Sequence, residues 1–263
     1  ALSHWFPANQ RNSAQGVLWM SARWGGAFAP PLVVLAMQWT TWRWTFVLFG
    51  LVGVVWAAFF YARFRDNPAD HPGVNERERA LLPKVEELTA AHAPAPWKQL
   101  LRSPSVWLLC GQYFCQGFFF YFLITWLPTY LREARHFDLQ QAAWLAGLPL
   151  LSGGAACFLS GQTLSWMERR WTAKRTRRCV AAGALTLATI FLLVVARIRD
   201  PRLAVIAIAL AAFSSDLSMP ICWTTCMDVG GRFAGTLSGT MNMWGNLGGT
   251  LSPIVVGHVL EWT

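Results

Sequence analysis

The stretch WTFVLFGLVGVVWAAFFYA, residues 44–62, contains no charged side chain. A helix rises about 1.5 Å per residue, so a helix of this length covers the roughly 30 Å hydrocarbon core of a bilayer. The run therefore predicts a helix that crosses a membrane.

The whole 263-residue chain shares this character, because 54% of its residues are hydrophobic and only 13% are charged. An ordinary soluble domain is less apolar and more charged. Seven stretches are long and apolar enough to span a membrane, namely 14–37, 44–62, 105–130, 142–167, 179–196, 203–225 and 234–260. The sequence predicts an all-α, multi-pass integral membrane protein with seven transmembrane helices embedded in a lipid bilayer.

The net charge of +9 is distributed unevenly between the two sides of the membrane. If the loops alternate sides, one side carries fifteen Lys and Arg residues and the other carries six. Cytoplasmic loops are the ones enriched in Lys and Arg, so the first and last spans run from the cytoplasm outward. The positive charge thus indicates membrane topology, and we expect no nucleic-acid partner.

A polar segment, residues 64–104, separates two spans from the other five. Long cytoplasmic linkers are common in membrane proteins that consist of two halves. We therefore expect residues 1–63 to be the end of a first bundle with two full helices, 64–104 a cytoplasmic loop, and 105–263 a second bundle with five helices. The chain starts without Met and stops just after a span, so we expect it to be a fragment.

Several motifs follow one another in the order found in a known family. They are WFPANQRNSAQG (5–16), FRDNPADHPGVNERE (64–78), FLITWLPTYL (122–131) and CMDVGGRFAGTLSGTMNMWGNLGG (226–249). The chain resembles the anion:cation symporter family of the major facilitator superfamily. The resemblance implies twelve helices, of which this chain holds about helices five to eleven.

The resemblance also implies a function. Members carry organic anions, especially sugar acids such as hexuronates, glucarate and galactonate, usually coupled to protons. We accordingly expect a monomeric secondary transporter in a bacterial inner membrane, without a cofactor or enzymatic activity, with H⁺ as the coupling ion and Na⁺ as the alternative. The loop 168–178 is similar to the family's basic loop between helices eight and nine, with Glu168 as its nearest acid.

Arg23 stands in SARWGGAFAPPL (21–32), the only charge between Ala14 and Met37. It lies roughly 15 Å into its span at about 1.5 Å per residue, near the middle of the bilayer. Ionisable groups at that depth usually face a wet cavity and have a partner. Either its guanidinium binds a substrate carboxylate with two hydrogen bonds, or it pairs with an acid on a neighbouring helix. The resemblance favours substrate binding, because the matching position carries a polar substrate-binding residue.

Asp216 is the second charge deep within a span. A carboxyl group that can gain and lose a proton is what a proton-coupled carrier needs. Asp216 is thus a candidate proton-coupling site, or it pairs with Arg23 or with a cation outside this chain. Pro220, four residues on, makes a weak point in the same span because proline frees a backbone carbonyl.

Asn242 and Asn246 lie four residues apart and share one helix face. They form an amide contact between helices or bind hydroxyl groups of a substrate. The resemblance implies a ligand-contacting Asn at 242 and an aromatic ligand contact at Trp223. Gln112 and Tyr121 are further candidates, either as hydrogen bonds between helices or as lining of a polar cavity.

Other function classes find less support in the residues. An intramembrane hydrolase needs paired aspartates, a Ser with a His, or an HExxH helix, whereas Asp216 stands alone and His258 lies near a span end. The interpretation as a seven-helix receptor is supported only by the number of predicted spans. A channel would need a filter-like loop or a ring of charged residues, and the sequence shows neither. Cys222 and Cys226 lie four residues apart, but no histidine completes a metal set, so we expect no metal site.

Overall fold

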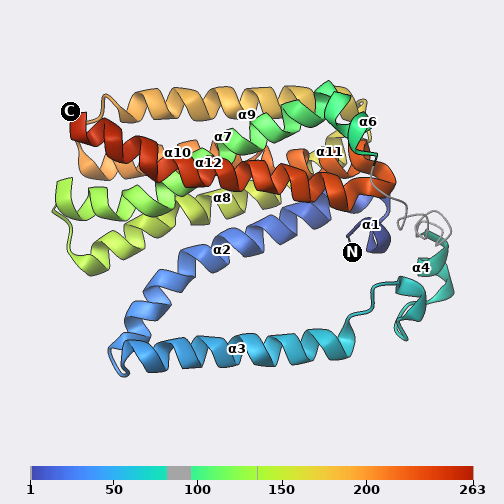
Figure 1. Ribbon diagram of the computed structural model, residues 1–263, viewed down its shortest axis with the longest axis horizontal. Helices are drawn as coiled ribbons and strands as arrows, with labels where there is room; N and C mark the ends of the chain where they lie inside the picture. The colour runs from blue at the N-terminus through green and yellow to red at the C-terminus, as the bar shows by residue number, and fades with distance from the viewer. Residues whose placement is uncertain (1, 82–95, 135, 263) are drawn as a thin grey trace.

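The computed structural model describes residues 2–81, 96–134 and 136–262 (Figure 1), and these residues form helices without any β-strand. The long helices are α2 (Arg11–Met37), α3 (Trp42–Arg63), α7 (Pro104–Thr129), α8 (Leu139–Met167), α9 (Ala173–Val195), α10 (Pro201–Asp216), α11 (Met219–Gly230) and α12 (Ala234–Trp262). Short helices are α1 (Leu2–Trp5), α4 (Glu76–Leu81) and α6 (Trp97–Arg102). The predicted all-α fold is confirmed. The middle of the expected cytoplasmic loop, 82–95, lies outside the described residues.

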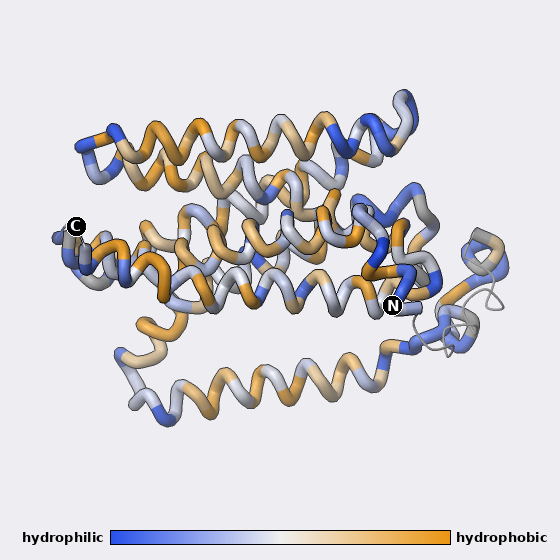
Figure 2. Tube along the Cα trace, turned by 45° about the horizontal axis from the view of Figure 1, so that its top comes forward, coloured by the Kyte–Doolittle hydropathy of each residue, from blue (hydrophilic) through white to orange (hydrophobic). Residues whose placement is uncertain are grey.

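Five helical stretches are long and apolar enough to cross a membrane: Trp42–Arg63, Pro104–Glu133, Gln140–Met167, Ala173–Val195 and Pro201–Trp262. The last of these covers α10, α11 and α12, which fold back on one another. Helix α2 also has spanning length, but Arg23, Pro30 and Pro31 make it less apolar. Figure 2 shows hydrophobic residues along the long helices and hydrophilic residues mainly near their ends and in the connections.

Helices α7 to α12 pack into one bundle, and α2 lies against it (Figure 1). The closest approaches are those of α12 to α7 and of α2 to α8. Glycines allow both, as small residues do between membrane helices. A Cβ atom on Gly16 of α2 would lie 2.8 Å from the carbonyl oxygen of Cys157 in α8, and one on Gly249 of α12 would overlap the ring of Tyr121 in α7.

Helix α3 stands apart from this bundle (Figure 1). Of its 22 residues, all described, only Thr45 is buried. Aromatic side chains on its surface are largely exposed, including Phe46 at 74% and Trp56 at 63%. An apolar helix with so little burial requires a lipid or protein environment around it.

The predicted span 203–225 is two helices, because the chain breaks after Asp216. Pro220 has no N–H group and leaves the carbonyl of Asp216 without its helical partner. Side chains of α8 supply donors instead: the Cys157 thiol donates to the Asp216 carbonyl at 3.5 Å and the Ser160 hydroxyl donates to the Leu217 carbonyl at 2.6 Å. The break places the Asp216 side chain at the end of α10, inside the bundle.

Candidate functional site

Arg23 and Asp216 form a double hydrogen-bonded ion pair. Arg23 Nε donates to Asp216 Oδ2 at 2.8 Å, and Arg23 Nη2 donates to Asp216 Oδ1 at 2.8 Å. Both residues are buried, and they join α2 to α10. Of the alternatives that the sequence left open, the structure therefore shows the pairing of Arg23 with Asp216.

The surroundings fix this pair in place. The Arg23 guanidinium carbon lies 4.1 Å from the ring centroid of Phe120 and 5.9 Å from that of Trp19, so two aromatic side chains hold the cation. The Asp216 carboxyl group lies against Gly153 of α8, where a Cβ atom would overlap it. As the last residue of α10, Asp216 is at the negative end of that helix, where a carboxylate is disfavoured. Arg23 therefore supplies the positive charge that compensates the Asp216 carboxylate.

A cavity of about 130 Å³ opens beside the ion pair. Residues from four helices line it, with polar side chains from α2, α7 and α12 and Met219 from α11: Trp19, Arg23, Tyr113, Gln116, Gly117, Phe120, Tyr121, Met219, Asn242, Gly245 and Asn246. Arg23 uses Nε and Nη2 for Asp216, and its Nη1 has no hydrogen bond to any part of the chain that the structure describes. One end of a buried cation thus remains available to the cavity.

Four of the seven predicted site residues line this cavity: Arg23, Tyr121, Asn242 and Asn246. The Tyr121 hydroxyl donates to Asn246 Oδ1 at 3.3 Å, and Asn246 Nδ2 donates to the Asn242 carbonyl at 2.9 Å. The side chains of Asn242 and Asn246 are exposed, so both amides can meet a solute. Helices α7 and α12 bring these groups together through the close glycine contacts described above.

Gln112 and Trp223 lie next to the cavity but do not line it. Gln112 is one helical turn from Gln116, whose amide Nε2 lies 2.7 Å from Ser218 Oγ. The Trp223 ring packs on Trp19, with the ring centroids 5.4 Å apart. Asp216, the seventh predicted residue, contacts the cavity through Arg23. The roles predicted for all seven residues stay predictions.

Sequence reasoning missed Trp19 and Phe120. The chain has sixteen Trp and seventeen Phe residues, so an aromatic side chain within a span carries no signal by itself. Trp19 lies one turn before Arg23 on the same helix face, and this spacing was the only available indication.

A second polar cluster lies at the end of α2 opposite to Met37, on the side predicted to be cytoplasmic. We call Arg11, Asn12, Glu168, Arg177 and Asp228 the cytoplasmic cluster. Arg177 pairs with Glu168 at 2.8 Å and with Asp228 at 2.6 Å, and Arg11 lies 3.6 Å from Asp228. Asn12 Nδ2 donates to Glu168 Oε2 at 2.9 Å. These contacts connect α2 to α8, α9 and α11.

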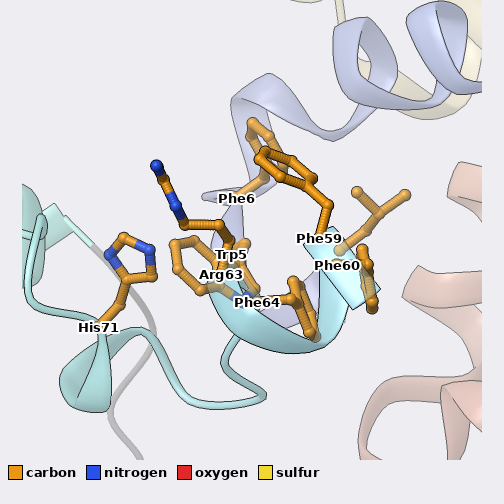
Figure 3. Close-up of a pocket in the computed structure, with 8 residues that line it drawn as sticks. Trp5, Phe6, Phe59, Phe60, Arg63, Phe64 and His71 are labelled. Carbon is orange, nitrogen blue, oxygen red and sulfur yellow. The ribbon is translucent and has the colours of Figure 1, made fainter. Parts of the chain in front are cut away.

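Two other pockets have a different character. A pocket of about 330 Å³ between α1 and α3 is lined by aromatic rings, with Arg63 and His71 at one side (Figure 3). A cavity of about 660 Å³ between α7, α9, α10 and α12 is mostly apolar. Neither presents several hydrogen-bonding groups beside a buried cation. A further pocket of about 620 Å³ has Asp138, Gln141 and Arg202 in its lining, but Arg202 is exposed. The cavity beside Arg23 is therefore the candidate site.

Comparison with known proteins agrees with this architecture. The chain is similar to the probable sulfoacetate transporter SauU of Cupriavidus necator, with 33% identity over 100% of this chain and 61% of the relative. It is similar to the chloroplast protein probable anion transporter 4 of Oryza sativa subsp. japonica, with 26% identity over 99% of this chain and 44% of the relative. It is also similar to the chloroplast ascorbate transporter of Arabidopsis thaliana, with 25% identity over 99% of this chain and 48% of the relative.

The chain spans about half the length of the curated relatives it matches. The family model of the Major Facilitator Superfamily matches residues 1–253. Together with its apolar helices, this match makes the chain part of an integral, multi-pass membrane protein. The chain belongs to the Major Facilitator Superfamily.

Proposed function

We propose that the protein is a secondary transporter that moves a small organic anion across the membrane by alternating access. The observation that carries this proposal is the cavity beside the Arg23–Asp216 pair, where Arg23 Nη1 is free of hydrogen bonds within the described residues. The names of three relatives, which refer to sulfoacetate, anions and ascorbate, support an anionic substrate.

The groups around the cavity suit an oxyanion that also carries polar substituents. Guanidinium nitrogens make strong, charge-assisted hydrogen bonds to carboxylate and sulfonate oxygens. The amides of Asn242 and Asn246 and the phenol of Tyr121 both donate and accept, so they can bind hydroxyl groups. Sugar acids and small sulfonates such as sulfoacetate are thus the candidate substrates.

The charges at the site support proton coupling. Arg23 and Asp216 together are neutral, so a bound anion adds an uncompensated negative charge in a poorly solvated place. Protonation of Asp216 removes that excess charge. Na⁺ fits less well, because it would have to bind Asp216 directly beside the Arg23 cation. We therefore propose H⁺ symport, with Asp216 as the coupling residue.

Alternating access requires that the site opens to each side in turn. In Figure 1, α2 lies close to α8 near its own beginning and diverges from the bundle towards its end. The cytoplasmic cluster holds the packed end together. This conformation corresponds to a state closed to the cytoplasm, and separation of α2 from α8 and α11 would open the inward path.

The test is uptake by the protein reconstituted in liposomes, together with any sequence that flanks these 263 residues in its source. Labelled sulfoacetate, glucuronate, galacturonate, glucarate and galactonate are each supplied with and without an inward proton gradient. We expect gradient-stimulated uptake of at least one acid. If uptake is the same with and without the gradient, the proposed proton coupling is wrong. If none of the five acids is taken up, the proposed substrate class is wrong.

A further inference from the structure

Three side chains near the cavity carry buried N–H groups without a hydrogen-bond acceptor in the described part of the chain. They are Trp19 Nε1, Gln112 Nε2 and Trp223 Nε1, the last of which faces the Tyr113 hydroxyl without meeting hydrogen-bond geometry. Buried polar groups in native proteins are nearly always hydrogen-bonded, and each exception needs an explanation. Gln116 Oε1, on a residue that lines the cavity, is a further unpaired atom, but the three N–H groups are the donors among them. Three such donors in one neighbourhood point to an acceptor that binds there in another state of the protein.

The three residues occupy one layer. Each is four residues from a residue that lines the cavity: Trp19 from Arg23 on α2, Gln112 from Gln116 on α7, and Trp223 from Met219 on α11. The charge distribution predicts that α2 and α7 run from the cytoplasm outward and that α11 runs towards the cytoplasm. Four residues are about one helical turn, so Gln112 and Trp223 lie about one turn on the cytoplasmic side of residues that line the cavity, and Trp19 lines its cytoplasmic side.

The layer adjoins the cavity through Trp19, the one of the three residues that lines it. The Trp19 and Trp223 ring centroids are 5.4 Å apart, and the Trp223 ring meets the Tyr113 ring edge-on at 5.7 Å. The Arg23 guanidinium carbon lies 5.9 Å from the Trp19 ring centroid, so the layer is next to the cation on its cytoplasmic side. Trp19 belongs to the first predicted bundle and Trp223 to the second, so their contact crosses the surface along which the halves separate.

We propose that Trp19, Trp223 and Gln112 form a second anion-binding site, the inner donor layer, which the transported anion occupies between Arg23 and the cytoplasm. This inference rests on the proposed function. An indole N–H donates and does not accept, so the two tryptophans favour an anion over a cation. In the present state the rings pack together and the donors are covered. Separation of α2 from α11 exposes both indole N–H groups to the same path, where a carboxylate or sulfonate satisfies them.

The experiment removes the donors while it keeps the rings. The double variant Trp19→Phe/Trp223→Phe retains aromatic packing and lacks both indole N–H groups. The matched control is Trp126→Phe, because Trp126 Nε1 is also buried without an acceptor in the described residues but lies beside the apolar cavity of α7, α9, α10 and α12. The measurements are uptake into liposomes and equilibrium binding, with sulfoacetate as the first probe and then the other four acids.

We expect the maximal uptake rate of the double variant to fall about tenfold, which corresponds to one lost hydrogen bond to an ion on the inward path. Equilibrium affinity for the Arg23 site should fall by less than the rate does, because phenylalanine at position 19 keeps an aromatic ring beside the Arg23 guanidinium, and Trp126→Phe should behave like the unmodified protein. Gln112→Met, which removes the amide donor at similar size, should lower the same rate in the same direction.

Other results would overturn the inner donor layer. They are an unchanged maximal rate in both Trp19→Phe/Trp223→Phe and Gln112→Met, an equal loss in Trp126→Phe, or a loss of affinity as large as the loss of rate. If the unmodified protein carries one of the acids and the double variant carries it equally fast, only the inner donor layer fails. If the unmodified protein carries none of them, the proposed function fails and the layer with it.

Discussion

Two ion-pair systems connect α2 to the rest of the helices, and they differ in burial. The side chains of Arg23 and Asp216 are 7% and 10% exposed, whereas Asp228 in the cytoplasmic cluster is 42% exposed. Both systems use a guanidinium and a carboxylate at hydrogen-bonding distance. The same chemistry therefore occurs in two solvent environments within one helix interface.

The difference in environment decides what each system can do. Removing one partner of a buried pair leaves an uncompensated charge and costs about 3–5 kcal/mol. An exposed pair is worth about 0–1 kcal/mol, because water and salt screen it. The buried pair can therefore open only when a ligand or a proton replaces a partner. In the cytoplasmic cluster the low value of an exposed pair applies only to the contacts of Asp228, because the Arg177 and Glu168 side chains are 13% and 14% exposed. The contacts of Asp228 are therefore the ones in this cluster that cost least to open.

The largest effect is expected from Arg23→Met, which leaves Asp216 buried and unpaired. We expect a loss of stability of about 3–5 kcal/mol and loss of anion uptake. Arg23→Lys should retain little uptake, because an ammonium group lacks the planar fork that binds a carboxylate through two nitrogens. Thermal unfolding in detergent and uptake into liposomes measure the two effects.

The control for this prediction is the double variant Arg23→Met/Asp216→Leu. Replacing a buried pair by apolar side chains is often neutral for stability, so the double variant should unfold close to the unmodified protein and still not transport. Normal uptake by Arg23→Met would refute the role of Arg23 in anion binding.

A smaller effect is expected from Asp216→Asn, which keeps the shape of the side chain and removes its charge. The weakened hydrogen bonds to Arg23 should cost about 1.5–3 kcal/mol. Uptake should lose its stimulation by a proton gradient, because the variant has no carboxyl group to protonate at this position. Exchange of labelled for unlabelled anion, which needs no net proton movement, should persist. Gradient-driven uptake at the original level would show that Asp216 is not the coupling residue.

The smallest effect is expected from Asp228→Asn in the cytoplasmic cluster. Stability should fall by about 1 kcal/mol or less, because Asp228 is partly exposed. Uptake should change by less than about fivefold, the factor that this energy corresponds to. Raising the ionic strength should reduce the difference between Asp228→Asn and the unmodified protein, since salt already screens this pair. A collapse of stability as large as that of Arg23→Met would contradict the comparison of the two systems.

The helices could be predicted from the sequence, because the hydropathy pattern that indicates them lies within each short segment. The run 44–62 became α3 (Trp42–Arg63), and the run 105–130 became α7 (Pro104–Thr129). The run 203–225 was predicted as one span with a weak point at Pro220. The actual break after Asp216 depends on donors from Cys157 and Ser160 in α8, which no local pattern of the run contains.

The candidate site was accessible only in part. Arg23 and Asp216 stood out because a charge deep in an apolar run is costly and therefore conspicuous. Their pairing stayed open, since either residue could have met a ligand or a helix outside the chain. Trp19 and Phe120 gave no signal in a sequence so rich in aromatic residues, and only the packing shows that they hold the Arg23 cation.

The sequence by itself determined the helices and their predicted sides of the membrane, because length, hydropathy and loop charge act within short segments. The tertiary structure decided which polar groups meet. Arg23 and Asp216 are 193 positions apart, and they join because Gly153 lets α10 lie against α8, while Gly16 and Gly161 let α2 do the same. Contacts of this kind depend on the fit between distant surfaces, which no single stretch of residues specifies.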